Sequence, residues 1–173
     1  MDRRADDTEV SGWQQLTRRA NRCMALRQYA AARQLYREAL WEAERLLEQS
    51  TRHSEPPAAG WDALLAAWVV SHHNMADLLD VLDDTQHAHE HLRQAHEGVM
   101  KLLAQGAQSG PVSQALHHAH RTRAALLQFG LRHPGFPGDE GHEGWPALAS
   151  DLPNDLSAET GSGATPRLPP FFN

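Results

Sequence analysis

The chain has 173 residues, a formal net charge of −6, and 40% hydrophobic residues. This length fits one domain with a substantial core, and no apolar run reaches the roughly 20 residues needed to cross a bilayer. The acidic balance argues against nucleic-acid binding, because contacts to phosphates need a concentrated basic surface. The charged N-terminal segment and the single cysteine, Cys23, predict a cytoplasmic protein in a reducing compartment.

Apolar residues at three- and four-residue spacing predict five helices in chain order. Residues 1–8 are expected to fray, and the helical domain is expected over residues 9–130. The predicted helices span residues 10–26, 28–48, 61–82, 86–103 and 111–129. Ser11 is the expected N-cap of the first helix, and Gly130 is the expected left-handed residue that ends the last. Proline and glycine predict a linker at about residues 50–60.

Residues 131–173 differ in composition from the helical part. They contain seven prolines and repeated glycines. Such a segment buries little surface and cannot hold a long helix, so we expect a mostly irregular tail.

Small and large residues recur at the same intervals in two stretches of the chain. The intervals are 9, 3, 4 and 3 residues, first over Ala20, Tyr29, Ala32, Tyr36 and Ala39, then over Ala76, Thr85, Ala88, Leu92 and Ala95. Alanines at these positions allow two helix axes to approach closely, and large residues fill the grooves beside them. The pattern therefore predicts two antiparallel helix pairs that stack on each other.

The two stretches resemble tetratricopeptide repeats. The resemblance rests on three sets of residues: Trp13, Leu16, Ala20, Tyr29, Ala32, Tyr36, Ala39 and Leu40 in the first unit; Met75, Ala76, Leu79, Ala88, Leu92 and Ala95 in the second; and His120, Arg123, Ala124 and Leu127 in a third first-helix. It implies an all-α fold, a short superhelix of antiparallel helix pairs whose first helices line a concave groove.

The resemblance also implies which residues line that groove. They are Thr17, Asn21, Met24, His73, Asp77, Asp80, His118 and Arg121. His73 and Asp77 are four residues apart and share a helical face. The favoured interpretation is a polar, metal-free binding surface. The alternative is a divalent metal site, such as a zinc site, built from His73, Asp77, His117, His118 and His120.

Histidine is the compositional outlier, because nine of the 12 histidines lie between His72 and His120. His72 and His120 occupy equivalent positions and are expected to face the core, either as separately hydrogen-bonded histidines or as a coupled pair. His87 and His91 are four residues apart, a spacing that can bind metal. Their helix position favours a solvated outer surface.

These observations predict a non-enzymatic scaffold that binds a peptide or helix of a partner protein. The alternatives are a metal-binding protein and, with less support, a metal-dependent enzyme. No nucleophile elbow, phosphate-binding loop or dinucleotide glycine motif is present. Since the last unit is incomplete, we expect the tail or a second copy of the chain, as a homodimer, to cover its open end.

Overall fold

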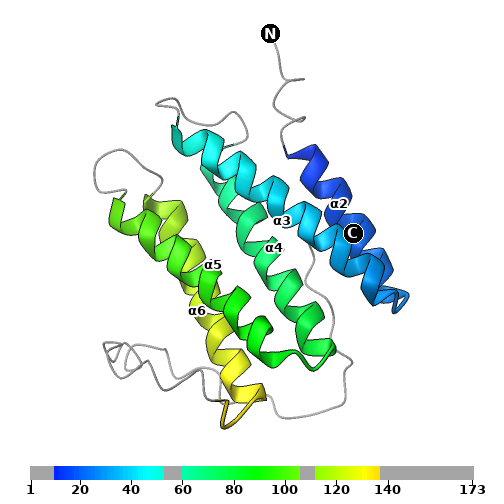
Figure 1. The fold of residues 1–173 in the computed structure, drawn as a ribbon. Helices are drawn as coiled ribbons and strands as arrows, with labels where there is room; N and C mark the ends of the chain where they lie inside the picture. Colours follow the sequence, from blue (N-terminus) through cyan, green and yellow to red (C-terminus); the bar gives the residue numbers. More distant parts are fainter. Residues whose placement is uncertain (1–9, 53–59, 106–111, 137–173) are drawn as a thin grey trace, which may run out of the picture. The chain divides into compact units, whose positions relative to one another are not determined.

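The computed structural model describes residues 10–52, 60–105 and 112–136. These residues form five α-helices and, within the described ranges, no strand (Figure 1). The helices are α2 (Ser11–Ala25), α3 (Tyr29–Arg52), α4 (Trp61–Val81), α5 (Thr85–Gln105) and α6 (Val112–Arg132). The all-α prediction with five main helices is therefore confirmed. The predicted frayed N-terminus, most of the predicted linker and residues 137–173 of the predicted tail lie outside the described residues.

The ends of two helices differ from the prediction. Ser11 is the first residue of α2, and Val10 holds the N-cap position without a side-chain cap. Helix α6 continues through Gly130 to Arg132, and the left-handed glycine after it is Gly135, with φ 87°. The sequence alone favoured Gly130 as a terminator because glycine is common there, but its backbone conformation in the structure is helical.

Helices α2 and α3 form one antiparallel pair, and α4 and α5 form another (Figure 1). Three-residue turns connect the helices within each pair. The amide of Gln28 donates to the carbonyl of Cys23 at 2.8 Å, and the amide of Asp84 donates to the carbonyl of Leu79 at 2.9 Å. Each is the hydrogen bond of a Schellman motif that spans five residues along the chain. The two turns therefore have the same backbone structure.

The alanine rows lie at the helix contacts, as the spacing predicts. Ala32 in the first pair and Ala88 in the second are both 0% exposed. Equivalent alanines in the same rows are also buried, namely Ala20, Ala39, Ala76 and Ala95. The large residue between the alanines is buried in both second helices as well, as Tyr36 and Leu92. The helices therefore approach through small residues and interlock through large ones.

Helix α4 is the central element, because α3, α5 and α6 all pack against it. Its apolar run is buried on nearly every side, including Leu64, Leu65 and Val69. None of the described helices combines the length and the apolar character that a membrane span requires.

Polar side chains also connect the helices inside the bundle. The Trp13 indole on α2 donates to Ser71 Oγ on α4 at 2.7 Å. His96 Nδ1 on α5 and Thr122 Oγ1 on α6 lie 2.9 Å apart, and both residues are buried. Such contacts satisfy buried polar groups and fix the register of neighbouring helices.

Candidate functional site

An open groove of about 410 Å³ lies between α3 and α5, above α4. We call it the α3–α5 groove. Its lining residues are Arg33, Arg37, Leu40, Trp41 and Glu44 from α3, Met75 and Leu79 from α4, and His87 and His91 from α5. Its floor is apolar and its walls are polar. This combination is typical of sites that bury an apolar side chain and orient it by polar contacts.

The α3 wall carries two arginines and an exposed tryptophan. Arg33, Arg37 and Trp41 are spaced by four residues, so they lie along one face of the helix. Both arginines are exposed, and Trp41 is 64% exposed. A large aromatic ring exposed beside guanidinium groups provides contact area and positive charge together. Further along, burial raises the pKa of Glu44.

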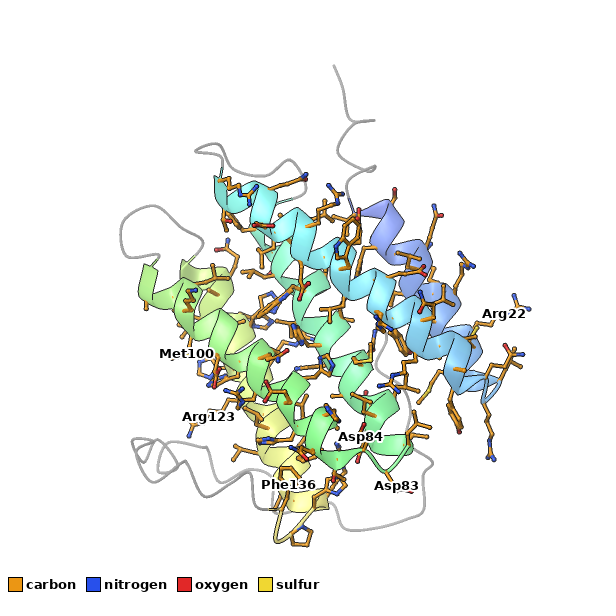
Figure 2. All side chains as sticks on the ribbon, in the orientation of Figure 1. Arg22, Asp83, Asp84, Met100, Arg123 and Phe136 are labelled. Atoms are coloured by element: carbon orange, nitrogen blue, oxygen red, sulfur yellow. The ribbon has the colours of Figure 1, made fainter. Side chains whose placement is uncertain are left out.

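The α5 wall carries two histidines in different surroundings. His87 is exposed, and its Nδ1 lies 2.7 Å from Asp84 Oδ1 at the start of α5, a residue that Figure 2 labels. The hydrogen bond from His87 lowers the pKa of Asp84. His91 is half-buried, and burial lowers its pKa. The solvated outer surface predicted for both histidines therefore holds for His87 and not for His91.

His91 connects the groove to the core. Its Nδ1 lies 3.2 Å from Nδ1 of His72, which is 2% exposed. Burial lowers the pKa of His72 to about 3, and His91 adds to this effect. The contact is therefore a hydrogen bond between two neutral imidazoles, one donating and one accepting. Trp68 packs edge-on against the His72 ring and shields it.

The residues predicted to line a groove on α2 are only partly at the surface. Thr17 is buried, so that part of the prediction is wrong. Asn21 is half-buried, and its Oδ1 accepts a hydrogen bond from the Tyr36 hydroxyl at 2.7 Å. Met24 is half-buried. The physical reason is the close packing of α2 on α3, which encloses the side of α2 that the repeat alignment assigned to the groove.

The predicted residues on α4 and α6 come close together, but much of the set is enclosed. His118 is 1% exposed and lies 3.2 Å from Asp62, so it is a core residue and not a groove residue. His73 is half-buried with its Nε2 enclosed. Burial lowers the pKa of His73 to about 4, and the charges of Arg121 and His118 lower it further. Arg121 itself is exposed.

The two predicted aspartates of α4 have different roles. Asp80 lies 3.2 Å from Arg132 and 2.7 Å from His133, so it holds the end of α6 against α4. Asp77 keeps an exposed surface, yet desolvation of its carboxyl group raises its pKa against the opposing charge of Arg132. Asp80 is therefore committed to an internal ion pair, and Asp77 remains at the surface.

The five residues of the predicted metal site do not gather. His117 and His120 are exposed, whereas His118 is buried. Across the described residues, no three His, Cys, Asp or Glu side chains form a group that could hold a metal ion. The prediction that His120 faces the core is wrong. Helix α6 buries Ala115, His118, Ala119, Thr122, Leu126 and Phe129 instead. Burial of the large Phe129 ring sets this register.

Sequence reasoning missed the α3 wall of the groove. The available signal was the four-residue spacing of Arg33, Arg37 and Trp41, which places an aromatic residue in the polar stripe of an otherwise amphipathic helix. A tryptophan in such a position is an exposed apolar residue that the core does not explain.

The chain matches a known family model. Residues 11–140 match the family model described as Protein of unknown function (DUF2753). No curated protein and no solved structure matches the chain. The matched range includes all five described helices.

Proposed function

The chain belongs to the DUF2753 family, and we propose that it is a non-enzymatic interaction module of the cytoplasm. It binds an acidic segment of a partner protein, extended or helical, in the α3–α5 groove. The observation that carries the proposal is the exposed row of Arg33, Arg37 and Trp41 beside an apolar floor. The helix pairs act as a tetratricopeptide-like support that holds this surface in place.

Charge supports an acidic ligand. Arg33 and Arg37 lie on the wall of the groove, whereas Glu44 is the one acidic residue among the described lining residues. Helices α3 and α5 run in the same direction, so their N-termini lie at the same end of the groove (Figure 1). The positive ends of two helix dipoles thus add to the arginine charges near Arg33. A segment that carries carboxylates is attracted to this end of the groove and accepts bidentate hydrogen bonds from arginine.

The floor supports an apolar anchor in the same ligand. Leu40, Met75 and Leu79 supply it, and Met75 and Leu79 are almost fully buried. Trp41 stands beside them with most of its surface exposed. Truncation of a central tryptophan or arginine in an interface commonly costs about 2 kcal/mol or more. Trp41 and Arg37 are therefore the two side chains on which binding should depend most.

The lining chemistry favours binding over covalent catalysis. The described residues around the groove include no serine, threonine or cysteine that could act as a nucleophile. Its histidine nearest the core, His91, contacts another histidine and not an acidic partner. The contact between His72 and His91 therefore provides no carboxylate that would orient a histidine as the base of a nucleophilic mechanism.

The test is site-specific photo-cross-linking in cells of the source species. A benzoylphenylalanine at position 41 should capture a partner through a segment rich in Asp and Glu, and Arg37→Glu should reduce that capture at least tenfold. Arg22→Glu is the matched control, because Arg22 is exposed on α2 and its side chain points away from the other helices (Figure 2). Equal loss with Arg22→Glu, or capture of basic segments, would reject the proposal.

Metal binding remains the second candidate, on the strength of one contact. The Nδ1 atoms of His72 and His91 are 3.2 Å apart, close to the separation of two nitrogens that share a tetrahedral zinc ion at 2.0–2.1 Å each. Elemental analysis of the untagged protein tests this function directly. Stoichiometric zinc that is lost in His91→Gln would establish metal binding. Purified protein that contains no metal would reject it.

A further inference from the structure

Most of the negative charge of the chain lies after its helical part. Residues 139–173, which lie outside the described residues, contain six of the 22 acidic residues and one of the 16 basic residues. They therefore carry −5 of the net charge of −6, and residues 1–138, with 16 acidic and 15 basic residues, carry −1. Because the helical part is close to neutral, its overall charge does not repel an acidic ligand.

Carboxylates and apolar residues alternate in the first part of this tail, residues 139–159, which we call the acidic segment. It contains no lysine or arginine. Its acidic residues are Asp139, Glu140, Glu143, Asp151, Asp155 and Glu159, and its large apolar residues are Trp145, Leu148, Leu152 and Leu156. A tryptophan that follows three carboxylates matches the chemistry of the α3–α5 groove, which offers arginines to the carboxylates and an apolar floor to the ring.

The arginines of the groove are not engaged by other described residues. Neither Arg33 nor Arg37 forms an ion pair with a described carboxylate. Glu38, next to Arg37 in the sequence, accepts a hydrogen bond from a glutamine of its own helix at 2.9 Å. Asp84 lies close enough to Arg33 to interact with its charge, but it already binds a histidine at 2.7 Å. Among the described lining residues, only Glu44 adds negative charge to the groove itself.

The described chain ends close to the groove. The turn after α6 brings the ring of Phe136 to 5.1 Å from the ring of His89 on α5. His89 lies on the side of α5 opposite to the two histidines that line the groove. In Figure 2, Phe136 and Asp84, at the start of α5, lie at the same end of the bundle.

The connecting stretch is long enough to reach the groove. A helix with its side chains is about 10–12 Å across, which is the width of α5 that the chain has to pass. Residues 137–144 precede Trp145, and these eight residues can extend over roughly 26 Å.

We propose that the acidic segment of the same chain occupies the α3–α5 groove when no partner is bound. Carboxylates of residues 139–143 would meet Arg33 and Arg37, and Trp145 would cover the apolar floor beside Trp41. The segment would then be an intramolecular competitor that a partner has to displace. This inference rests on the proposed function, because it takes the groove as a site for an acidic segment with an apolar anchor.

The short connection favours the segment of the same chain over that of a second copy. Both have the same chemistry. A segment on a short linker has an effective concentration of about 1 mM, roughly a thousandfold above the concentration of a protein present at micromolar levels. A contact that is too weak to hold two copies together is therefore well populated within one chain.

The test is photo-cross-linking in the purified full-length protein, with no partner present. Benzoylphenylalanine at position 41 should cross-link to residues 139–159, identified by mass spectrometry. Arg37→Glu should reduce this cross-link roughly tenfold or more, and so should the double variant Glu140→Lys with Glu143→Lys. All three substitutions together should restore part of it, because the charges are again complementary. Arg22→Glu is the matched control and should leave the cross-link unchanged.

Mixing unlabelled with ¹⁵N-labelled protein separates the two sources of the segment. Cross-linked peptides that join a labelled to an unlabelled half would assign the segment to a second copy and overturn the proposal. Absence of any cross-link to residues 139–159, or a cross-link that survives both Arg37→Glu and the double variant, would also overturn it. Circular dichroism of each variant checks that the helices remain folded, as expected for Arg22 and Arg37, which are exposed.

The outcome can be distinguished from that of the proposed function. Capture of a partner in cells, without the intramolecular cross-link, would support the proposed function and overturn this inference. The intramolecular cross-link without a captured partner would do the reverse. Where both are observed, Glu140→Lys with Glu143→Lys should increase capture of the partner, because the competitor is weakened. Unchanged capture would overturn the competition between the segment and the partner.

Discussion

Arg27 and Asp83 occupy the same place in two equivalent turns, and both have left-handed backbones, with φ of 56° and 59°. Each is the residue after the helix C-cap, where glycine is the usual choice because it has no Cβ. Their conformations are held by two hydrogen bonds per turn, including those from Arg27 to Met24 and from Asp83 to Asp80 at 3.0 Å. The repeat visible in the sequence therefore extends to the backbone of its turns.

This relationship predicts that glycine stabilises the fold at both positions. A non-glycine residue in the left-handed region costs roughly 1–2 kcal/mol, and the greater freedom of glycine in the unfolded chain offsets part of the gain. Arg27→Gly and Asp83→Gly should each raise the free energy of unfolding by about 0.5–1 kcal/mol, measured by urea denaturation. Arg27→Ala is the control and should bring no such gain. A loss of stability with glycine would mean that the Arg27 side chain contributes more than its strained backbone costs.

Two glycines in helices predict opposite effects of the same substitution. A Cβ placed on Gly98 of α5 would lie 2.1 Å from the Trp68 ring of α4, whereas a Cβ on Gly130 of α6 meets nothing within 4 Å. Gly98→Ala should therefore destabilise the protein by about 1–3 kcal/mol through overpacking. Gly130→Ala should stabilise it by about 0.5–1 kcal/mol, because alanine favours helix. Thermal unfolding followed by circular dichroism measures both. Similar shifts in the two variants would contradict the close contact between α4 and α5.

The first two helix pairs could be predicted from the sequence because one physical requirement fixes several residues at once. Close approach of helices needs small residues at both sides of a contact, and the matching intervals around Ala32 and Ala88 satisfy it twice. Tyr36 and Leu92 differ in chemistry but fill the same space. The spacing of small and large residues therefore predicts which face of each of these four helices is buried.

The register of α6 could not be predicted in this way. Leucines lie on both sides of this helix, so Leu126 and Leu127 offer two apolar faces, and only the first is buried. Alignment of this helix with α4 predicts that the face of His120 and Leu127 is buried. In the structure Phe129 packs inward, and the face that carries it is buried instead. The α3–α5 groove was missed for a related reason. The groove depends on the distance between α3 and α5, which are not consecutive in the sequence. The periodicity of residues within one helix gives no information on that distance.

The ion pairs at the end of α6 predict a local effect of Asp80. This carboxylate is mostly enclosed and binds both Arg132 and His133. Asp80→Asn should lower the free energy of unfolding by about 1 kcal/mol, since it removes the carboxylate that binds the partly exposed side chains of Arg132 and His133. Hydrogen exchange should show the largest increase in the last turn of α6. Asp83→Asn is the control, because Asp83 is exposed in the turn. Faster exchange throughout α4 instead would show that Asp80 supports the core and not the helix end.

The buried histidines predict that stability falls as the solution becomes mildly acidic. Burial lowers the pKa of His72 to about 3 and that of His73 to about 4, from an ordinary value of 6.5. Between these values and pH 6.5 the unfolded chain binds more protons than the folded chain, so the free energy of unfolding decreases as pH decreases. Each such histidine contributes up to about 1.4 kcal/mol per pH unit in this range. Asp77 and Glu44, whose pKa values burial raises, act in the opposite direction.

Urea unfolding at pH values from 5 to 7 separates these contributions. His72→Gln should reduce the slope of unfolding free energy against pH, because it removes one proton uptake on unfolding, whatever it does to stability at pH 7. The slope is informative where absolute stability is not, since loss of the contact with His91 lowers stability at every pH. An unchanged slope in His72→Gln would mean that the pKa of His72 is the same in the folded and unfolded chains. In that case His72 would be protonated in the folded chain at pH 5, where its contact with His91 would be an imidazolium–imidazole pair and the α3–α5 groove would carry an additional positive charge beneath its floor.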